Sequence, residues 1–282
     1  MPVAPAGRGT VGSVKSQSPL AKVRRFVPPV AWDALRARVG TRFRGHYASW
    51  GEALDACDGY DAPAVLERVA EATRAVVRGD AAFERDSILF DRIEYSWPML
   101  ASLLFVATQR DGRLNVVDFG GSLGSSYRQN AKFLASLPNV TWSIVEQANF
   151  AELGKREFET ERLRFHADLS SCLASTTPDV VLFSSVLQYV EDPYGVLELV
   201  ARHGVPYLLV DRTPFIDGSE DRLTVQTVSK RIYPASYPAW FFSRERFMRA
   251  LAPSYRLLEE FECADRASNV PSRFLGQLFK RA

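Results

Sequence analysis

Two acidic residues and a group of glycines follow two apolar segments, in positions where they could hold a small ligand. The first segment ends at Asp118 and leads into a loop with Gly120, Gly121 and Gly124, and the second ends at Glu146. Glycine lets the backbone of such a loop approach a ligand closely and adopt a positive φ. A carboxylate at the end of the second strand is the usual acceptor for both hydroxyls of a ribose. Two carboxylates, with no lysine in the loop, favour a nucleoside ligand without phosphates.

The spacing of these glycines distinguishes between the common nucleotide-binding loops. A dinucleotide fingerprint needs glycines at i, i+2 and i+5, and a P-loop needs Gly-Lys-Ser/Thr after four spacer residues; the loop has neither. Instead, Asp118–Gly124 resembles Asp-x-Gly-Gly-x-x-Gly, the first motif of the class I S-adenosylmethionine (SAM)-dependent methyltransferases. Ser122 departs from that motif, because many members carry a further glycine there. A plain strand–turn–helix corner remains the alternative for the loop taken alone.

The elements that must position this loop alternate along the chain. Apolar segments typical of strands lie at 116–119, 141–145, 163–165, 180–184 and 207–211. Segments with helical periodicity lie at 127–137, 150–158, 194–202 and 244–251. This alternation predicts an α/β fold with a doubly wound parallel sheet. Two final strands, 255–262 and 274–280, predict a closing hairpin characteristic of methyltransferase sheets, so we expect a Rossmann-like, seven-stranded sheet.

The stretch before the first strand has a helical pattern. Ser49 and Glu52 have the spacing of a capping box. Pro63 suits the first turn of a second helix that ends at Gly79, and a third helix begins near Ser96. Methyltransferases usually place a lid or an acceptor-binding element here. The predicted parts are an N-terminal arm (1–44), a helical lid and acceptor-binding subdomain (45–112) and a SAM-binding core (113–282).

The predicted arm carries an excess of positive charge. Residues 1–44 contain nine lysines and arginines against one acid, a net +8, whereas the whole chain has a formal charge of +2, so the remainder carries −6. Such an arm could contact nucleic acid, an anionic membrane or a charged polymer. Residues 1–18, rich in Pro, Gly and Ser, are more typical of a flexible leader. Apolar residues within 19–39 would suit docking on the body of the protein or on a membrane surface.

Length and composition limit the class of protein. The 282 residues suffice for one large α/β domain and a smaller appendage. Cys57, Cys172 and Cys263 are odd in number and lack metal-ligand spacing, so we expect reduced thiols and no metal site. No apolar run approaches the ~20 residues of a membrane span, and the N-terminus lacks the apolar stretch of a signal peptide. We therefore expect a cytoplasmic protein.

A wider resemblance covers nearly the whole chain from about residue 26. The chain is similar to a family of methyltransferases often found in surface-polysaccharide gene clusters. The segments that carry this resemblance are Gly45–Trp50, Asp118–Ser125, Val145–Gln147, Asp211–Phe215 and Ile232–Phe241. The resemblance implies the methyltransferase fold and SAM as the cofactor, and it leaves the acceptor undefined.

The loops after the first four strands should surround the cofactor, because the carboxyl ends of parallel strands converge at the topological switch point. The predicted cofactor-binding residues are Asp118, Gly120, Gly121, Ser122, Gly124, Glu146, Gln147, Asp168, Leu169 and Ser184. We expect Asp118 near the methionine ammonium, Glu146 at the ribose and Ser184 beside the sulfonium. Asp168 either accepts a hydrogen bond from the adenine amino group or caps the following helix.

The acceptor site is less well defined by the sequence. A hydroxyl acceptor must lose its proton to a base, and the candidate bases or acceptor contacts are His46, Tyr47, Asp211, Arg212 and Tyr237. Each also has a structural explanation: Tyr47 could hold the lid, Arg212 could pair with an acid, and residues 233–242 could pack a loop. Aromatic faces stack well on sugar rings. We therefore expect a hydroxyl or amine of a sugar, or of a similar small polar acceptor, between residues 45–60 and 233–242.

Other functions remain as alternatives. A nucleic-acid methyltransferase would explain the basic arm, but the chain lacks the Asn/Asp-Pro-Pro-Tyr/Phe motif for exocyclic amines, to which Glu191–Tyr194 has only a superficial likeness. A tailoring enzyme for another small metabolite, or a non-catalytic SAM-binding partner of a glycosyltransferase, would share the cofactor motif. We expect a small-molecule or sugar acceptor and no nucleic acid, with the arm available to an anionic membrane or a glycosyltransferase.

Overall fold

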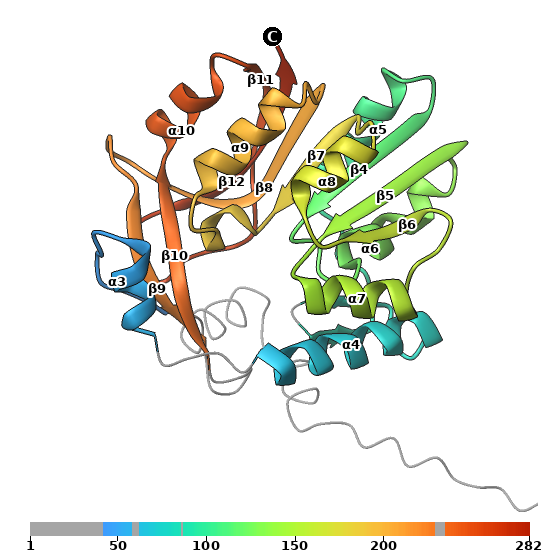
Figure 1. Cartoon of the computed structure of the whole chain (residues 1–282), viewed down its shortest axis with the longest axis horizontal. Helices are drawn as coiled ribbons and strands as arrows, with labels where there is room; N and C mark the ends of the chain where they lie inside the picture. Colours follow the sequence, from blue (N-terminus) through green and yellow to red (C-terminus); the bar gives the residue numbers. More distant parts are fainter. Residues whose placement is uncertain (1–41, 58–61, 86, 229–234) are drawn as a thin grey trace, which may run out of the picture. The chain divides into compact units, whose positions relative to one another are not determined.

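The computed structural model describes residues 42–57, 62–85, 87–228 and 235–282 (Figure 1). The chain divides into two compact units, Met1–Gly40 and Thr41–Ala282, and the described residues all belong to the second. Most of the predicted arm (1–44) therefore lies outside the described residues, as do Tyr233 and Pro234 of the predicted aromatic segment.

The core is a mostly parallel sheet that starts at β4 (Arg113–Phe119) in the middle. The chain adds β5 (Asn139–Val145) and β6 (Leu163–His166) on one side of β4 and then β7 (Val180–Ser184) and β8 (Tyr207–Ile216) on the other. The order across the sheet is β6, β5, β4, β7, β8, β12 (Arg273–Arg281) and β11 (Tyr255–Glu262). The first five strands are parallel, and β12 is antiparallel to both of its neighbours. These strands confirm the predicted doubly wound sheet and its closing hairpin. The topological switch point lies between β4 and β7, where such sheets bind ligands.

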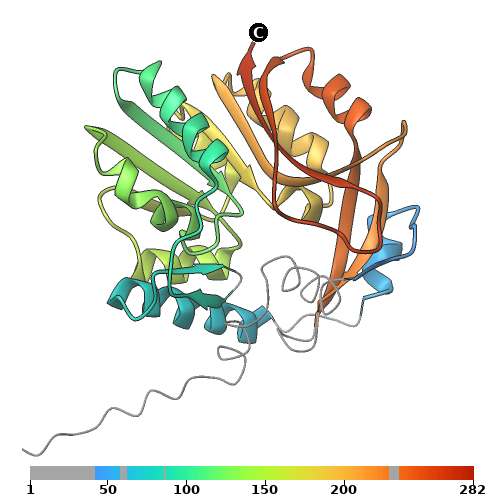
Figure 2. The ribbon, with the colours of Figure 1, turned by 180° about the vertical axis from the view of Figure 1, so that it is seen from behind.

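Helices cover both faces of this sheet. One face carries α5 (Trp97–Thr108), α6 (Ser125–Leu134) and α7 (Ala148–Glu157), and the other carries α8 (Leu169–Ser175), α9 (Pro193–Arg202) and α10 (Arg244–Leu251). Alternate strand residues supply the two cores, because successive side chains of a strand point to opposite faces. Val116 thus packs with the first set of helices and its neighbour Val117 with the second. Figure 2 shows α5 and α6 from behind the view of Figure 1.

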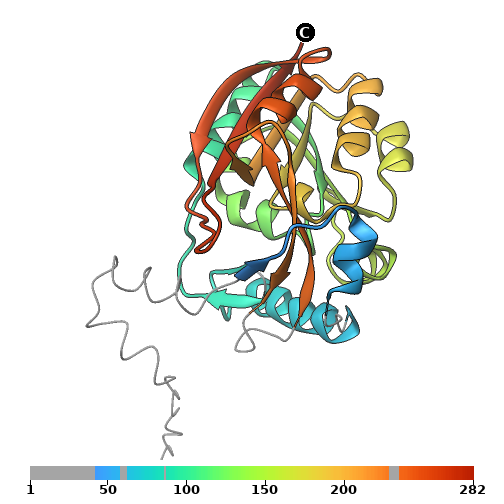
Figure 3. The same cartoon turned by 90° about the vertical axis from the view of Figure 1, so that its left-hand side faces the viewer.

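Three further strands extend the sheet beyond β8, which the sequence did not predict. They are β10 (Ser236–Ser243), β9 (Arg222–Thr227) and β1 (Arg42–Arg44). Only the end of β10 pairs with β8, in parallel, while β9 is antiparallel to both β10 and β1. The helix α3 (Trp50–Asp55) packs on this extension through Ala53, and its Trp50 ring stacks on that of Trp240, with centroids 6.4 Å apart. Figure 3 looks onto this side of the molecule.

The segment before β4 contains the predicted helices and an unpredicted hairpin. The predicted second helix is α4 (Ala62–Arg78), and the strands β2 (Phe83–Arg85) and β3 (Ile88–Phe90) follow it. The capping box is confirmed in part: Ser49 accepts from the N–H of Glu52, whereas the Glu52 carboxylate accepts from Ala48. The helix α5, which precedes residue 112, packs on the sheet of the predicted core. The predicted boundary at residue 112, between the helical lid and the SAM-binding core, stays a prediction. Within the described part of the chain, no helix is long and apolar enough to cross a membrane.

Candidate functional site

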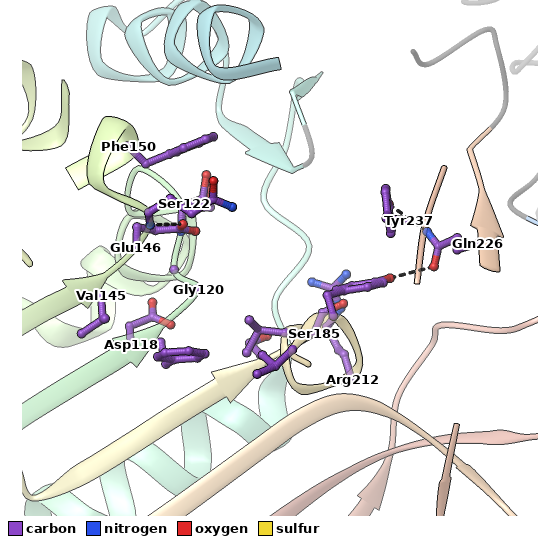
Figure 4. Close-up of a pocket in the computed structure, with 18 of the residues that line it drawn as sticks. Asp118, Gly120, Ser122, Val145, Glu146, Phe150, Ser185, Arg212, Gln226 and Tyr237 are labelled. Atoms are coloured by element: carbon purple, nitrogen blue, oxygen red, sulfur yellow. Dashed lines mark hydrogen bonds between the residues drawn. The ribbon is translucent and has the colours of Figure 1, made fainter. Parts of the chain in front are cut away.

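A cavity of about 1340 Å³ lies at the carboxyl ends of the central parallel strands. The loops after β4, β5, β6 and β7 line one part of it, and Arg212 lines it from within β8. Residues of α3, α4, β9 and β10 line another part. Figure 4 shows two groups of side chains in this cavity: one around Gly120, Ser122 and Glu146, the other around Arg212, Gln226 and Tyr237. The first group contains predicted cofactor residues, and the second lies where we expected the acceptor.

The loop after β4 has a shape that requires glycine. Gly120 has a φ of +71°, and a Cβ there would overlap the side chain of Val186. A Cβ on Gly121 would lie 2.6 Å from the carboxyl carbon of Asp118. Ser122, where many class I methyltransferases carry another glycine, also adopts a left-handed conformation with a φ of 53°. Ser122 therefore keeps the backbone shape that a glycine would adopt at this position of the motif. The conformation costs some strain, because non-glycine residues rarely adopt it.

Glu146 is attached directly to this loop. Its Oε1 accepts from the N–H of Ser122 at 3.1 Å, and its Oε2 accepts from the N–H of Gln147 at 3.0 Å. Burial raises the pKa of the Glu146 carboxyl, and these two N–H groups oppose that effect. Both oxygens keep lone pairs for further donors, because an ionised carboxylate has about four acceptor positions. Glu146 and Gln147 line the cavity, so the acid can receive a pair of ligand hydroxyls.

Asp118 lies beneath the same loop. Its side chain is fully buried at 1% exposure, and its Oδ2 accepts from the indole N–H of Trp142 at 2.9 Å. Burial raises the pKa of Asp118 to about 7, the charge of Glu146 adds to this, and the Trp142 hydrogen bond opposes it. Asp118 lines the cavity, which is compatible with the predicted place near a ligand ammonium.

Asp168 is a helix cap. Its Oδ2 accepts from the N–H of Ser171 at 2.7 Å at the start of α8, and this bond lowers the pKa of the carboxyl. The helix-cap alternative is therefore confirmed. Asp168 and Leu169 also line the cavity, so contact with the adenine stays a prediction.

The end of β7 and the middle of β8 carry two polar pairs. Ser184 lines the cavity, and its hydroxyl donates to Oδ2 of Asp211 at 2.8 Å. Asp211 is buried, and this burial raises its pKa. A bulge in β8 follows, where the register with β12 shifts opposite Asp211 and Arg212. Arg212 adopts a φ of 54°, lines the cavity and pairs with Asp265 at 3.2 Å, as the structural explanation predicted.

A hydrogen-bonded group of three residues forms another part of the wall. The hydroxyl of Tyr189, which follows β7, donates to Oε1 of Gln226 at 2.9 Å. Nε2 of Gln226 donates to the hydroxyl of Tyr237 at 2.9 Å, and the two tyrosine rings meet edge to face with centroids 5.2 Å apart. Tyr189 and Gln226 were not among the predicted site residues. Gln226 lies on β9, and this strand was not predicted from the sequence, so Gln226 was not expected at the site.

The five acceptor candidates do not all meet at the cavity. Arg212 and Tyr237 are among the described residues that line it, whereas His46, Tyr47 and Asp211 are not. His46 is exposed, and Tyr47 packs with α3 while its N–H donates to Leu223. The structure therefore brings together two of the candidates and adds Tyr189, Gln226 and Asp265 to them.

Comparisons with known proteins give fold similarity at low identity. No family model matches the chain, and no curated protein matches it. Among solved structures, the N-terminal domain of EvdMO1, in the presence of S-adenosylhomocysteine (SAH) and D-fucose, is 15% identical, with a TM-score of 0.47, over 79% of this chain and 98% of that one. The Burkholderia thailandensis 1,6-didemethyltoxoflavin-N1-methyltransferase, with SAH bound, is 16% identical with a TM-score of 0.44, over 85% and 93%.

A third similar structure is SAM-bound CalS10, an amino pentose methyltransferase from Micromonospora echinaspora, which is 13% identical with a TM-score of 0.42, over 74% of this chain and 96% of that one. The fold is defined by the order of the strands in the chain itself. The chain has the α/β Rossmann-like methyltransferase fold, with a mostly parallel central sheet and a closing antiparallel hairpin.

Proposed function

We propose that this protein is a SAM-dependent methyltransferase that acts on a hydroxyl or amine of a small polar acceptor. One observation carries the proposal: the glycine loop after β4 and the acid after β5 are joined by the hydrogen bond from Ser122 to Glu146, at the mouth of the switch-point cavity. Glycine loops and a terminal acid in this arrangement bind nucleosides at the carboxyl ends of parallel strands.

The residues present fit SAM. Because Gly120 and Gly121 lack a Cβ, the loop packs closely against Val186 and Asp118. The backbone of this loop lines the cavity, where it would contact the methionine part, and Asp118 would face its ammonium. Glu146 would accept from the ribose hydroxyls, and Asp168 and Leu169 would lie by the adenine. When bound, SAM supplies an electrophilic methyl group on a positively charged sulfur. The protein's task is then to hold the acceptor in line and to exclude water.

The size of the cavity supports two ligands. Pockets for one small molecule commonly measure roughly 300–1,000 Å³, and this cavity of about 1340 Å³ is larger. We place the acceptor against Tyr189, Gln226 and Tyr237, since aromatic rings stack on sugar rings and the amide can fix a hydroxyl. A sugar or surface-glycan precursor is the acceptor class that we propose, and the resemblance of the sequence to polysaccharide-linked methyltransferases supports it.

Two measurements test the proposed function. Calorimetry should show binding of SAM and SAH to the purified protein, and none of NAD or ATP. A screen with isotopically labelled SAM against glycans, lipid-linked sugars and small metabolites should then identify the acceptor by label transfer. Stabilisation by NAD without SAM binding would overturn the proposal. SAM binding without transfer to any acceptor would favour the non-catalytic partner module.

A further inference from the structure

Trp142 is a core tryptophan whose indole contacts the acid at the start of the glycine loop. The residue lies on β5, opposite Val116 of β4, and its side chain is fully buried at 0% exposure. Its indole N–H donates to Oδ2 of Asp118 at 2.9 Å, and the ring of Tyr127 packs against it at 5.8 Å. Trp142 therefore connects the hydrophobic core to the acid that ends β4.

The Asp118 carboxylate depends on this contact. Glu146 accepts from two backbone N–H groups, of Ser122 and Gln147. In contrast, the indole of Trp142 is the one donor to the Asp118 carboxylate among the described residues. The backbone at Gly121 closes over the carboxyl group, so the side chain has little room to turn to another donor. Figure 4 shows Asp118 below Gly120, on the same side of the cavity as Glu146.

The surrounding charges do not favour the anion. Glu146 adds a second negative charge nearby, and burial removes Asp118 from water. Arg128 on α6 lies at this loop, but it donates to the carbonyl of Leu123, and the nearby charge that raises its pKa is that of Glu84 on β2. Arg128 is not among the groups that shift the pKa of Asp118. The Trp142 hydrogen bond is the contribution that favours ionised Asp118, and the sum of these effects gives a pKa of about 7.

We propose that Trp142 is a positioning residue that fixes the Asp118 carboxylate beneath the glycine loop and keeps it available, as an anion, to the positive charge of SAM. This inference rests on the proposed function, because it assumes that SAM occupies the cavity. The indole N–H holds one oxygen of the carboxylate, and the other oxygen is left for the ligand. A cation that binds there should also displace a proton from any Asp118 that is still neutral.

The proposal predicts a characteristic pH profile for SAM binding. Only ionised Asp118 attracts the ammonium of the cofactor, so the affinity should rise with pH through the pKa of Asp118. It should fall again where the α-amino group of SAM loses its proton, at an ordinary pKa of roughly 7.7–8. Trp142→Phe keeps an aromatic ring but removes the N–H, so the rise should move upward by about one pH unit. At about pH 7 this variant should bind SAM roughly five-fold more weakly than the parent, because the ionised fraction of Asp118 falls from about one half to about one tenth. At about pH 9 the two proteins should bind SAM nearly equally well.

Matched variants distinguish this role from a loss of packing. Trp240→Phe also removes an indole N–H, which donates to Val190 at 3.1 Å, and it should leave the pH midpoint of SAM binding unchanged. Asp118→Asn should flatten the profile, and Trp142→Phe added to it should not shift the profile further. If Trp142→Phe loses the same factor of SAM affinity at every pH, the proposal is overturned. If the parent binds no SAM at any pH, the proposed function is overturned instead.

A second measurement does not depend on the folding of Trp142→Phe. Indole N–H resonances of the parent can be followed by NMR, and the sequence has five tryptophans. One resonance should titrate near pH 7 and shift on SAM binding, and neither change should occur in Asp118→Asn. If each of the five resonances shows the same pH dependence in Asp118→Asn as in the parent, Trp142 does not report on the ionisation of Asp118, and the proposal fails.

Discussion

The backbone N–H of Ser122 donates to Oε1 of Glu146 at 3.1 Å, so the loops that follow two neighbouring strands are held together as one unit. The glycine loop and the acid therefore do not act as separate ligand contacts. A ligand that binds Glu146 also meets a loop whose shape Glu146 helps to fix. This coupling makes ligand binding in this part of the cavity sensitive to changes at either residue.

Glu146→Ala should weaken SAM binding strongly. The variant loses a charge-assisted contact, typically about 1.5–3 kcal/mol, which corresponds to roughly a ten- to hundred-fold rise in Kd. It also removes the acceptor of the Ser122 N–H. Calorimetry with SAM checks the prediction, and Glu152→Ala, which removes an exposed acid on α7, should bind as the parent does. Equal affinity of Glu146→Ala and the parent would show that the ribose lies elsewhere.

Gly120→Ala should reduce or abolish SAM binding because its Cβ would overlap Val186 at the cavity. Gly204 is a matched control, since it has a φ of +72°, close to the +71° of Gly120, and its Cβ would meet no atom within 4 Å. Both variants should share the backbone strain, about 1–2 kcal/mol. The midpoint temperature of thermal unfolding should therefore fall in both variants, whereas the affinity for SAM should fall only in Gly120→Ala. A loss of binding in both would point to stability alone.

Tyr237→Phe should raise the KM for the acceptor and leave SAM affinity unchanged. The substitution keeps the ring and removes the hydroxyl that accepts from Gln226, so the wall loses this hydrogen bond and keeps the one from Tyr189 to Gln226. Tyr255→Phe is the control, because its hydroxyl bonds to Val205, which is not among the cavity-lining residues of the described chain. Steady-state kinetics with the acceptor found by the screen give the KM of both variants. A loss of SAM binding in Tyr237→Phe would move this residue into the cofactor site.

Deletion of residues 1–25 should leave methyl transfer to a small acceptor intact. The expectation follows from charge, because the basic excess of the sequence is confined to its first 44 residues and the remainder is acidic. Transfer rates of the shortened and full-length chains, measured with the same small acceptor, check it. Activity on RNA or DNA that disappears with the deletion would instead identify a nucleic-acid substrate.

Much of the core was predictable because its signals are local. Strand β7 was predicted at its observed bounds, 180–184, and so was helix α10 at 244–251. Buried parallel strands are continuous apolar runs, and the helices between them are periodic, so each element is recognisable within its own window. The strand β8 was predicted to end at Asp211, but it continues to Ile216 through a bulge. A polar Asp-Arg pair followed by Pro214 resembles the end of a strand in sequence.

The second half of the cavity was not predictable in the same way. Strand β9 pairs with β10 and β1, and β1 is separated from β9 by more than 170 residues of sequence, so no local pattern indicates this pairing. His46 and Tyr47 were candidates because of their residue types, yet their places in the fold keep them out of the cavity wall. Gln226 lies between Tyr189 and Tyr237 only because β9 is part of the sheet.

The sequence by itself determined the doubly wound sheet, the loop from Asp118 to Gly124 and the acid Glu146 at the end of the next strand. These features follow from backbone preferences and burial within short segments, which one stretch of chain encodes alone. The tertiary structure decided that Trp142 is the hydrogen-bond donor to Asp118, that Arg212 pairs with Asp265, and that Gln226 joins two tyrosines. Such contacts join residues distant in sequence, because side chains meet only when the sheet register and the helix packing are fixed.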